Sequence, residues 1–96
     1  MLSELELKTR SMEKILSIDF IRRPKSSRIY SFGYDQDLQR LYVLFQNGNI
    51  YMYYHVLKTD YNEMVNAESV GKKFQEVIIQ LHYGYRRMYL TKLADV

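Results

Sequence analysis

The hydrophobic pattern is clearest at residues 40–56, where two apolar, aromatic runs flank the dipeptide Asn47-Gly48. Both runs are rich in Tyr, Val, Ile, Leu and Phe, the residue types that fit a pleated, half-buried surface. Asn and Gly tolerate the positive φ angles of a type I′ turn at the least cost. The stretch therefore predicts a β-hairpin, and the rest of the chain is interpreted around it.

The length of the turn decides which side chains of the hairpin share a face. In a two-residue loop, Phe45 faces Ile50. The more apolar face, expected to be core, is then Leu41, Val43, Phe45, Ile50, Met52, Tyr54 and Val56. The other face is Tyr42, Leu44, Tyr51, Tyr53 and His55. A three-residue loop with a bulge would slip the second strand by one residue and place Tyr51 and Tyr53 beside Phe45. We expect the two-residue loop.

Before the hairpin, residues 3–20 have an imperfect helical period. Ser3 is suited to cap this helix, and Glu4 and Glu6 fall in its first turn, where the helix dipole favours acidic residues. A basic, turn-like linker follows at residues 22–27. Residues 28–35 then predict a first strand, in which Gly33 indicates a bulge or a close approach of backbones.

After the hairpin, a short helix is expected to start at Thr59 or Asp60. A second helix is predicted from about residue 72 to residue 83, because its apolar positions form one stripe at helical spacing. Gly84 suits a left-handed cap at its end. The predicted fold is α+β: a three-stranded antiparallel β-meander followed by two short helices, with an extra N-terminal helix.

Composition bounds the class of protein. The chain has 96 residues, of which 47% are hydrophobic and 26% charged, so we expect one globular domain. It has no cysteine, which excludes disulfides, thiolate metal sites and a cysteine nucleophile. No apolar run approaches the length of a membrane span, and the N-terminus has no secretory pattern, so we expect a cytoplasmic protein without membrane contact.

Tyrosine is the unusual component, with ten residues and no tryptophan. An excess of tyrosine suggests a contact surface, because each ring combines apolar area with a polar tip. The simpler interpretation is that most of these rings are half-buried sheet residues, and we favour it. The net charge of +3 permits nucleic-acid binding but does not require it.

An ordered set of short motifs runs from residue 26 to about residue 85. The set consists of Ser26-Ser27, Gly33-Tyr34-Asp35, Leu41-x-Val43-x-Phe45, Gly48, Tyr51-x-Tyr53, Val56 and Ala67-x-Ser69-x-Gly71-x-x-Phe74. On these residues the chain resembles the KTSC domain family, with one departure at Leu57, where the family usually has proline. The resemblance divides the chain into an N-terminal helix and basic linker (1–25), a KTSC-like domain (26–89) and a tail (90–96).

The family is named for a short domain at the C-terminus of some lysyl-tRNA synthetases, and it also occurs as small stand-alone proteins of bacteria and their phages. The resemblance implies a small antiparallel sheet followed by helix. It also suggests RNA binding, through the synthetase context alone.

The residues themselves indicate a non-catalytic binding module for RNA or another nucleotide-containing ligand. Tyrosines on the less apolar hairpin face would stack unpaired bases, and basic residues would form the rim. The candidate ligand-binding residues are Tyr42, Tyr51, Tyr53, Arg22, Arg23, Arg28, Arg40, Arg86 and Arg87. The opposing interpretation is that helices cover this face and the arginines are simply solvated, and we favour it.

Two other functions remain open: a homo-oligomer that sequesters a small nucleotide ligand, and a module that binds a protein partner. We expect no enzyme, because His55 and His82 are the only histidines and neither lies in a catalytic or metal-binding motif. We expect no catalytic residue, no metal site and no cofactor.

Overall fold

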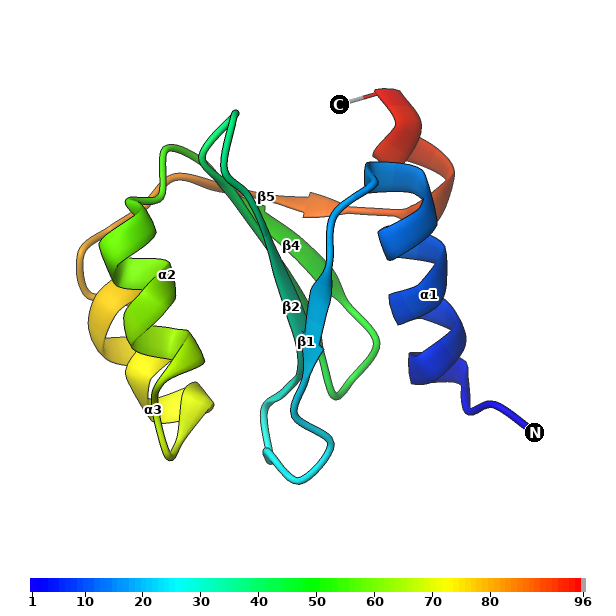
Figure 1. Ribbon diagram of the computed structural model, residues 1–96, viewed down its shortest axis with the longest axis horizontal. Coiled ribbons are helices and arrows are strands. Elements are labelled where there is room, and N and C mark those ends of the chain that lie inside the picture. Colours follow the sequence, from blue (N-terminus) through cyan, green and yellow to red (C-terminus); the bar gives the residue numbers. More distant parts are fainter. Residues whose placement is uncertain (96) are drawn as a thin grey trace.

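A five-stranded antiparallel sheet lies between two helical layers in the computed structural model, which describes residues 1–95 (Figure 1). The elements are α1 (Glu4–Leu16), β1 (Phe20–Arg22), β2 (Ile29–Asp35), β3 (Arg40–Phe45), β4 (Ile50–Tyr53), α2 (Lys58–Val65), α3 (Val70–Phe74), a π-helical turn (Gln75–Ile79), β5 (Tyr85–Met88) and a 3-10 helix (Leu90–Asp95). The strand order is β1-β2-β3-β4-β5. The α+β class is confirmed, but a three-stranded meander understates the sheet by the two short edge strands β1 and β5.

The hairpin of β3 and β4 has a three-residue loop, so the expected two-residue register is wrong and the bulged alternative is correct. The Phe45 N–H donates to the Asn49 carbonyl at 2.9 Å, and the Gly48 N–H donates to the Phe45 carbonyl at 2.9 Å. Gly48 has a φ of 90°, whereas Asn47 is not in the left-handed region. One left-handed glycine after the turn therefore closes the hairpin and gives a pairing of Val43 with Tyr51.

The register slip exchanges the two faces of β4. Tyr53 now lies on the same side as Leu41 and Val43, in the cluster under α2 and α3. Ile50 and Met52, expected beside those residues, lie instead in the cluster under α1.

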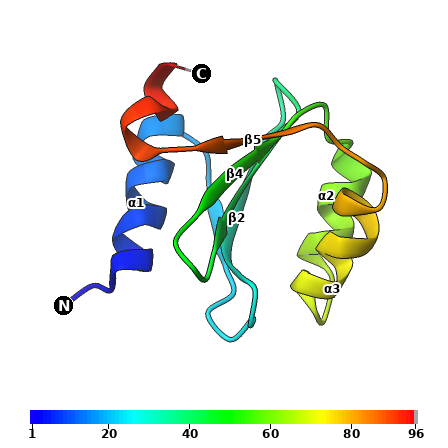
Figure 2. The same cartoon turned by 180° about the vertical axis from the view of Figure 1, so that it is seen from behind.

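The first helical layer is α1 together with the C-terminal 3-10 helix, and both pack on the same face of the sheet (Figures 1 and 2). Ser3 caps α1 as expected: it accepts from the Glu6 N–H at 3.1 Å, and the Glu6 carboxylate accepts from the Ser3 N–H at 3.2 Å. The helix ends at Leu16, because Ser17 takes a left-handed conformation. Residues 18 and 19 connect the helix to β1.

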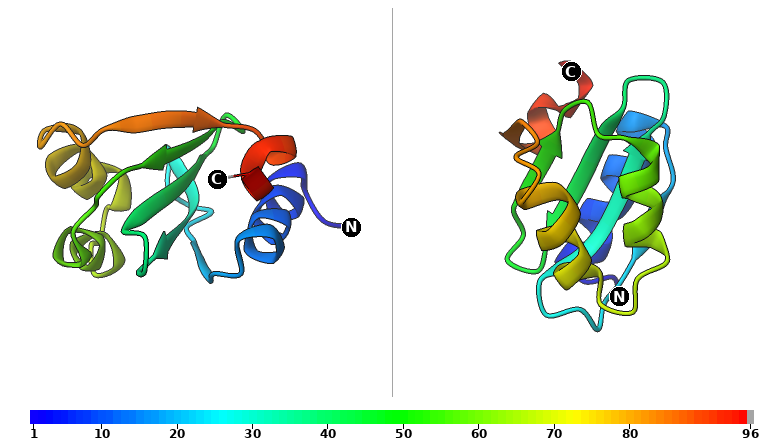
Figure 3. Two further views of the ribbon diagram at one scale, coloured as in Figure 1. Left: turned by 90° about the horizontal axis from the view of Figure 1, so that it is seen from above. Right: turned by 90° about the vertical axis from the view of Figure 1, so that its left-hand side faces the viewer.

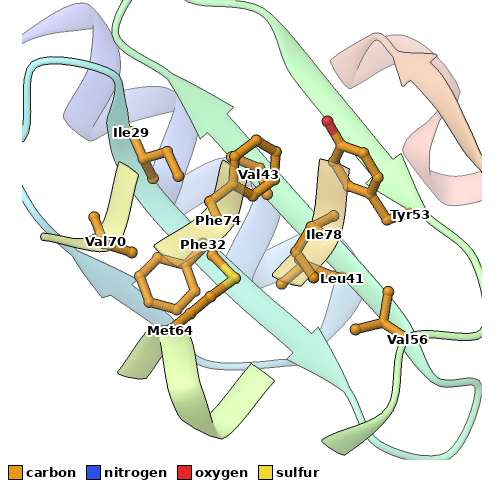
Figure 4. Close-up of a cluster of buried hydrophobic side chains, with 10 residues drawn as sticks. All are labelled: Ile29, Phe32, Leu41, Val43, Tyr53, Val56, Met64, Val70, Phe74 and Ile78. Atoms are coloured by element: carbon orange, nitrogen blue, oxygen red, sulfur yellow. The ribbon is translucent and has the colours of Figure 1, made fainter. Parts of the chain in front are cut away.

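The second layer is α2, α3 and the π-helical turn, which cover the opposite face (Figure 3). Phe74 and Ile78 are fully buried there against strand residues such as Phe32 and Leu41 (Figure 4). The predicted apolar stripe is thus confirmed for these two positions. The predicted cap at Gly84 is wrong, since His82, with a φ of 59°, is the left-handed residue at the end of this segment.

The edge strand β1 is held by a close approach at Gly33. A Cβ atom on Gly33 would lie 2.6 Å from two ring carbons of Phe20 and 2.9 Å from the Asp19 carbonyl oxygen. Phe20 pairs with Gly33 across the β1–β2 ladder, so the ring occupies the space that a side chain would take. The sequence signal at Gly33 therefore reports a close approach and not a bulge.

Candidate functional site

The three tyrosines predicted to share one hairpin face lie on two faces. Tyr42 is 1% exposed and belongs to the cluster under α1. Tyr51 and Tyr53 lie on the opposite face, in or against the cluster under α2 and α3. Burial raises the pKa of the Tyr42 hydroxyl. Tyr42 is therefore a core residue and is removed from the candidate site.

Tyr51 and Tyr53 form an aromatic group with Tyr85, which β5 contributes. The rings of Tyr51 and Tyr53 stack with centroids 6.4 Å apart, and each lies 5.8 Å from the ring of Tyr85. Tyr85 pairs directly with Tyr53 across the β4–β5 ladder, so the two side chains point to the same side. We call Tyr51, Tyr53 and Tyr85 the tyrosine cluster.

The three rings differ in how deeply they are buried. Tyr53 is 3% exposed and packs edge-on against Phe74, with ring centroids 5.5 Å apart. Burial raises the pKa of its hydroxyl, and the neighbouring Tyr51 raises it further. Tyr51 is half-buried, and Tyr85 is 62% exposed. The second helical layer therefore covers one end of the cluster and leaves the other end open.

The open end borders a hollow of about 710 Å³, which we call the tyrosine groove. Its lining residues are Ser27, Arg28, Phe45, Gln46, Asn47, Asn49, Tyr51, Tyr53, Ile79 and Tyr85. Arg28 is the one charged residue among them, and its guanidinium donates to the Gln75 side chain at 2.9 Å and lies 5.4 Å from the centre of the Phe74 ring. The groove thus combines an aromatic wall, amide side chains and one oriented cation.

Of the other predicted arginines, only Arg87 lies beside this groove. It pairs with Tyr51 across the β4–β5 ladder, and it donates to Asn49 Oδ1 at 2.9 Å. Arg86 pairs with Met52, so it belongs to the side of the sheet that α1 covers.

Three more predicted arginines lie apart from the tyrosine groove. Arg22 forms an ion pair with Glu13 of α1 at 2.8 Å. Arg23 donates to the Val65 carbonyl at 3.1 Å and lies 5.9 Å from the centre of the Phe32 ring, at the β1 side of the sheet. Arg40 opens β3 opposite Asp35 and has the same strand parity as Tyr42, so it too belongs to the α1 side. The predicted basic rim is therefore divided between the two faces and the β1 side of the sheet.

Sequence reasoning missed Tyr85, which completes the tyrosine cluster. Residues 85–89 read Tyr-Arg-Arg-Met-Tyr, in which apolar and polar residues do not alternate, so the sequence alone gives no strand signal there. The segment becomes a strand because β4 offers an edge to pair with.

Some other site types find no support in residues 1–95. No group of three or more His, Cys, Asp or Glu side chains there is placed to hold a metal ion. No helix in the same residues has both the length and the apolar character needed to cross a membrane.

The geometry thus defines a small α+β protein with a helix-covered sheet and one open aromatic groove. The family model of the KTSC domain matches residues 25–83, which is more than half of the chain, and the chain belongs to the KTSC domain family. It is 36% identical over 64 residues to an uncharacterised protein of Stutzerimonas stutzeri (strain A1501), covering 67% of this chain and 90% of that protein.

A solved relative has the same fold. The crystal structure of a KTSC domain protein from Yersinia pestis matches with a TM-score of 0.63 at 30% identity, covering 74% of this chain and 100% of the other. The family match begins at residue 25, so α1 and β1 precede it.

Three positions of the family resemblance have structural roles outside the lining of the tyrosine groove. Ser26 accepts from the Ile29 N–H at 3.1 Å and fixes the entry to β2. Ser69 caps α3 by accepting from the Lys72 N–H at 3.3 Å. Leu57, where the family usually has proline, has a φ of −67°, which proline also adopts, and its N–H donates to the Tyr83 hydroxyl at 3.2 Å. Leucine therefore retains the proline-like backbone and adds a hydrogen bond.

Proposed function

We propose that this protein is a non-catalytic binding module that holds an unpaired base of RNA, or of another nucleotide-containing ligand, in the tyrosine groove. The observation that supports this most directly is the open end of the tyrosine cluster, where Tyr51 and Tyr85 are accessible beside the oriented guanidinium of Arg28. An aromatic ring offers a face on which any base can stack, and a guanidinium is a fork-shaped donor that matches phosphate oxygens.

The polar groups of the groove suit the edge of a base. The Gln46 amide N–H group donates to the Ser26 carbonyl at 2.8 Å, which leaves the amide oxygen directed away from that bond as an acceptor. Asn49 Oδ1 already accepts from Arg87, so its amide N–H group is the donor that remains for a ligand. A donor and an acceptor beside a stacking face are the means by which single-stranded RNA is recognised.

The test is a pair of substitutions at each of the two accessible tyrosines. Tyr51→Leu and Tyr85→Leu remove the stacking face, whereas Tyr51→Phe and Tyr85→Phe retain it and serve as matched controls. Fluorescence anisotropy with a labelled oligouridylate is the measurement. Stacking is worth roughly 1–3 kcal/mol per base, so each leucine variant is expected to bind about 5-fold to 150-fold more weakly, and the phenylalanine variants within about 3-fold of the parent. Equal affinities for the leucine and phenylalanine variants would contradict the proposal.

The alternative is a protein partner, and the position of β5 favours it. β5 is the last strand of the sheet, and its residues Tyr85–Arg87 are exposed. An exposed edge strand can add a strand from another chain, and Tyr and Arg are typical hot-spot residues. An absence of oligonucleotide binding, combined with a protein ligand whose affinity falls in Tyr85→Ala, would support this alternative. A small-nucleotide ligand held by a homo-oligomer would show as binding of mononucleotides as tight as that of oligonucleotides.

A further inference from the structure

A second, larger hollow adjoins the tyrosine groove. It has a volume of about 970 Å³ and lies between the segment that joins β1 to β2 and the start of α3. We call it the basic groove. Its charged lining residues are Arg22, Arg23, Lys25, Arg28, Lys72, Glu68 and Glu76. Five cations and two anions give this lining a net charge of +3, equal to that of the whole chain.

Ion pairs with residues outside the groove leave the excess of cations unchanged. Arg22 is paired with Glu13, and Glu76 is paired with Lys73 at 3.2 Å. Removing one cation and one anion leaves four cations, among them Lys25 and Lys72, against Glu68. Within residues 1–95, neither Lys25 nor Lys72 forms an ion pair, and both side chains are exposed. These two lysines are therefore available to a ligand anion.

Arg28 and Ser27 join the two grooves, because both residues line both hollows. The bond from Arg28 to Gln75 of the π-helical turn holds the guanidinium at this junction. A ligand whose base stacks on Tyr51 would thus have its phosphate near Arg28, and the next phosphates would enter the basic groove. Mononucleotides would use only the first of these two sites.

We infer that the basic groove takes the sugar–phosphate backbone of a single-stranded oligonucleotide, one base of which is held in the tyrosine groove. The inference rests on the proposed function and names its ligand class: an oligonucleotide, bound across both grooves through phosphates at Arg28, Lys25 and Lys72. Charge complementarity selects this occupant, since phosphodiesters supply one negative charge per nucleotide along a continuous strand.

The experiment compares two double variants with the same change in net charge. Lys25→Ala with Lys72→Ala removes both available lysines of the basic groove. The control, Lys14→Ala with Lys92→Ala, removes two exposed lysines of α1 and the C-terminal 3-10 helix, outside both grooves. Anisotropy is measured with labelled oligouridylates of two lengths, a dinucleotide and an octanucleotide, between about 50 and about 300 mM KCl.

The parent protein is expected to bind the octanucleotide at least about 10-fold more tightly than the dinucleotide. Each phosphate contact on a single strand contributes about 0.7 to the slope of log affinity against log salt, so the groove variant should lose about 1.4 from the octanucleotide slope. The control variant should keep the parent slope.

Three outcomes would overturn the inference. Equal slopes in the two double variants, with Tyr51→Leu still weakening binding, would overturn the basic groove alone and leave the proposed function standing. Equal affinity for the dinucleotide and the octanucleotide would do the same. The absence of measurable binding to either oligonucleotide would overturn both.

Discussion

The two faces of the central sheet carry similar aromatic and aliphatic residues but differ in how completely helices cover them. On the α1 face, Tyr42, Leu44 and Met52 are all at most 1% exposed. On the opposite face, Tyr53 is buried against Phe74, while Tyr51 on the same strand is half-buried and Tyr85 on the next strand is exposed. Residue type is therefore a poor guide to function here. A tyrosine on this sheet is a core residue where a helix covers it and a surface residue where none does.

The two faces of the sheet are also stabilised in different ways. The α1 face is stabilised by its apolar cluster and by a buried hydrogen bond of 2.8 Å between Thr9 and Ser31. The opposite face is held by an apolar cluster of aliphatic and aromatic side chains, with ring contacts such as that of Phe32 with Tyr61 at 5.9 Å between centroids. One end of this face, at Tyr51 and Tyr85, is left uncovered, and it borders the tyrosine groove.

The strongest test of the comparison is truncation of one tyrosine from each face. Tyr42→Ala should lower the free energy of unfolding by about 3–5 kcal/mol, because it removes a fully buried ring and leaves a cavity. Tyr85→Ala, at an exposed position, should change it by no more than about 0.5 kcal/mol. Urea unfolding followed by far-UV circular dichroism measures both values. Similar losses in the two variants would mean that the faces do not differ as described.

A smaller loss of stability is expected when a methyl group is added at Gly33, on the strand beside the edge strand β1. Gly33→Ala would place its Cβ 2.6 Å from the ring of Phe20, and such overpacking costs about 1–3 kcal/mol. Gly71→Ala is the matched control: its Cβ would have no neighbour closer than 3.5 Å, and alanine is favoured over glycine inside a helix. Thermal unfolding should rank Gly33→Ala below the parent and Gly71→Ala level with it or above. A reversed ranking would show that β1 does not rest on this contact.

Local signals in the sequence were sufficient for much of the fold. The cap at Ser3, the hairpin around Gly48 and the helical stripe of Phe74 and Ile78 each depend on residues a few positions apart. The short strands β1 and β5 do not depend on local signals. Each forms only by pairing with a strand already in place. One extra residue in the hairpin loop also moved each side chain of β4 to the opposite face of the sheet. The alternation of residues along β4 could not show which loop length is present.

The candidate site was predictable only in part for the same reason. Tyr51, Tyr53, Arg28 and Arg87 were candidates from the sequence and do meet at one groove or its border. Tyr85 was missed with its strand. Tyr42 was assigned to the wrong group, because the register slip and the cover by α1 both depend on tertiary contacts.

The buried hydrogen bond between Thr9 and Ser31 predicts that the stability losses from substituting these two residues are not additive. Thr9 Oγ1 donates to the Leu5 carbonyl at 3.0 Å, so its one proton is used and Ser31 is the donor in the bond between them. Thr9→Val would leave the buried Ser31 hydroxyl without an acceptor and should cost about 1–3 kcal/mol. Ser31→Ala removes the donor together with its need for a partner and should cost about 0.5–1.5 kcal/mol.

The double variant, Thr9→Val with Ser31→Ala, should lose less than the sum of the two single losses. Once both hydroxyls are absent, no unsatisfied polar group remains. A double-mutant cycle from urea unfolding gives the coupling energy directly. Strict additivity would show that the two hydroxyls act independently.

The smallest effect at neutral pH is expected from removing one buried hydroxyl on the opposite face. Burial raises the pKa of the Tyr53 hydroxyl, so above about pH 10 the unfolded chain loses this proton while the folded chain retains it. The resulting stability is fully present below about pH 10 and is lost as the pH rises further. Burial also raises the pKa of four other tyrosines: Tyr34, Tyr42, Tyr61 and Tyr83.

Tyr53→Phe keeps the ring against Phe74 and removes one of these titrating groups. The free energy of unfolding should therefore fall with pH in both proteins, but less steeply in the variant, by about 1.4 kcal/mol per pH unit between pH 10 and the raised pKa. Urea titrations at steps from neutral pH to about pH 11 measure the slope. An identical slope in the two proteins would show that Tyr53 is as accessible as the open end of its own cluster, and the division of that cluster into a covered and an open end would then fail.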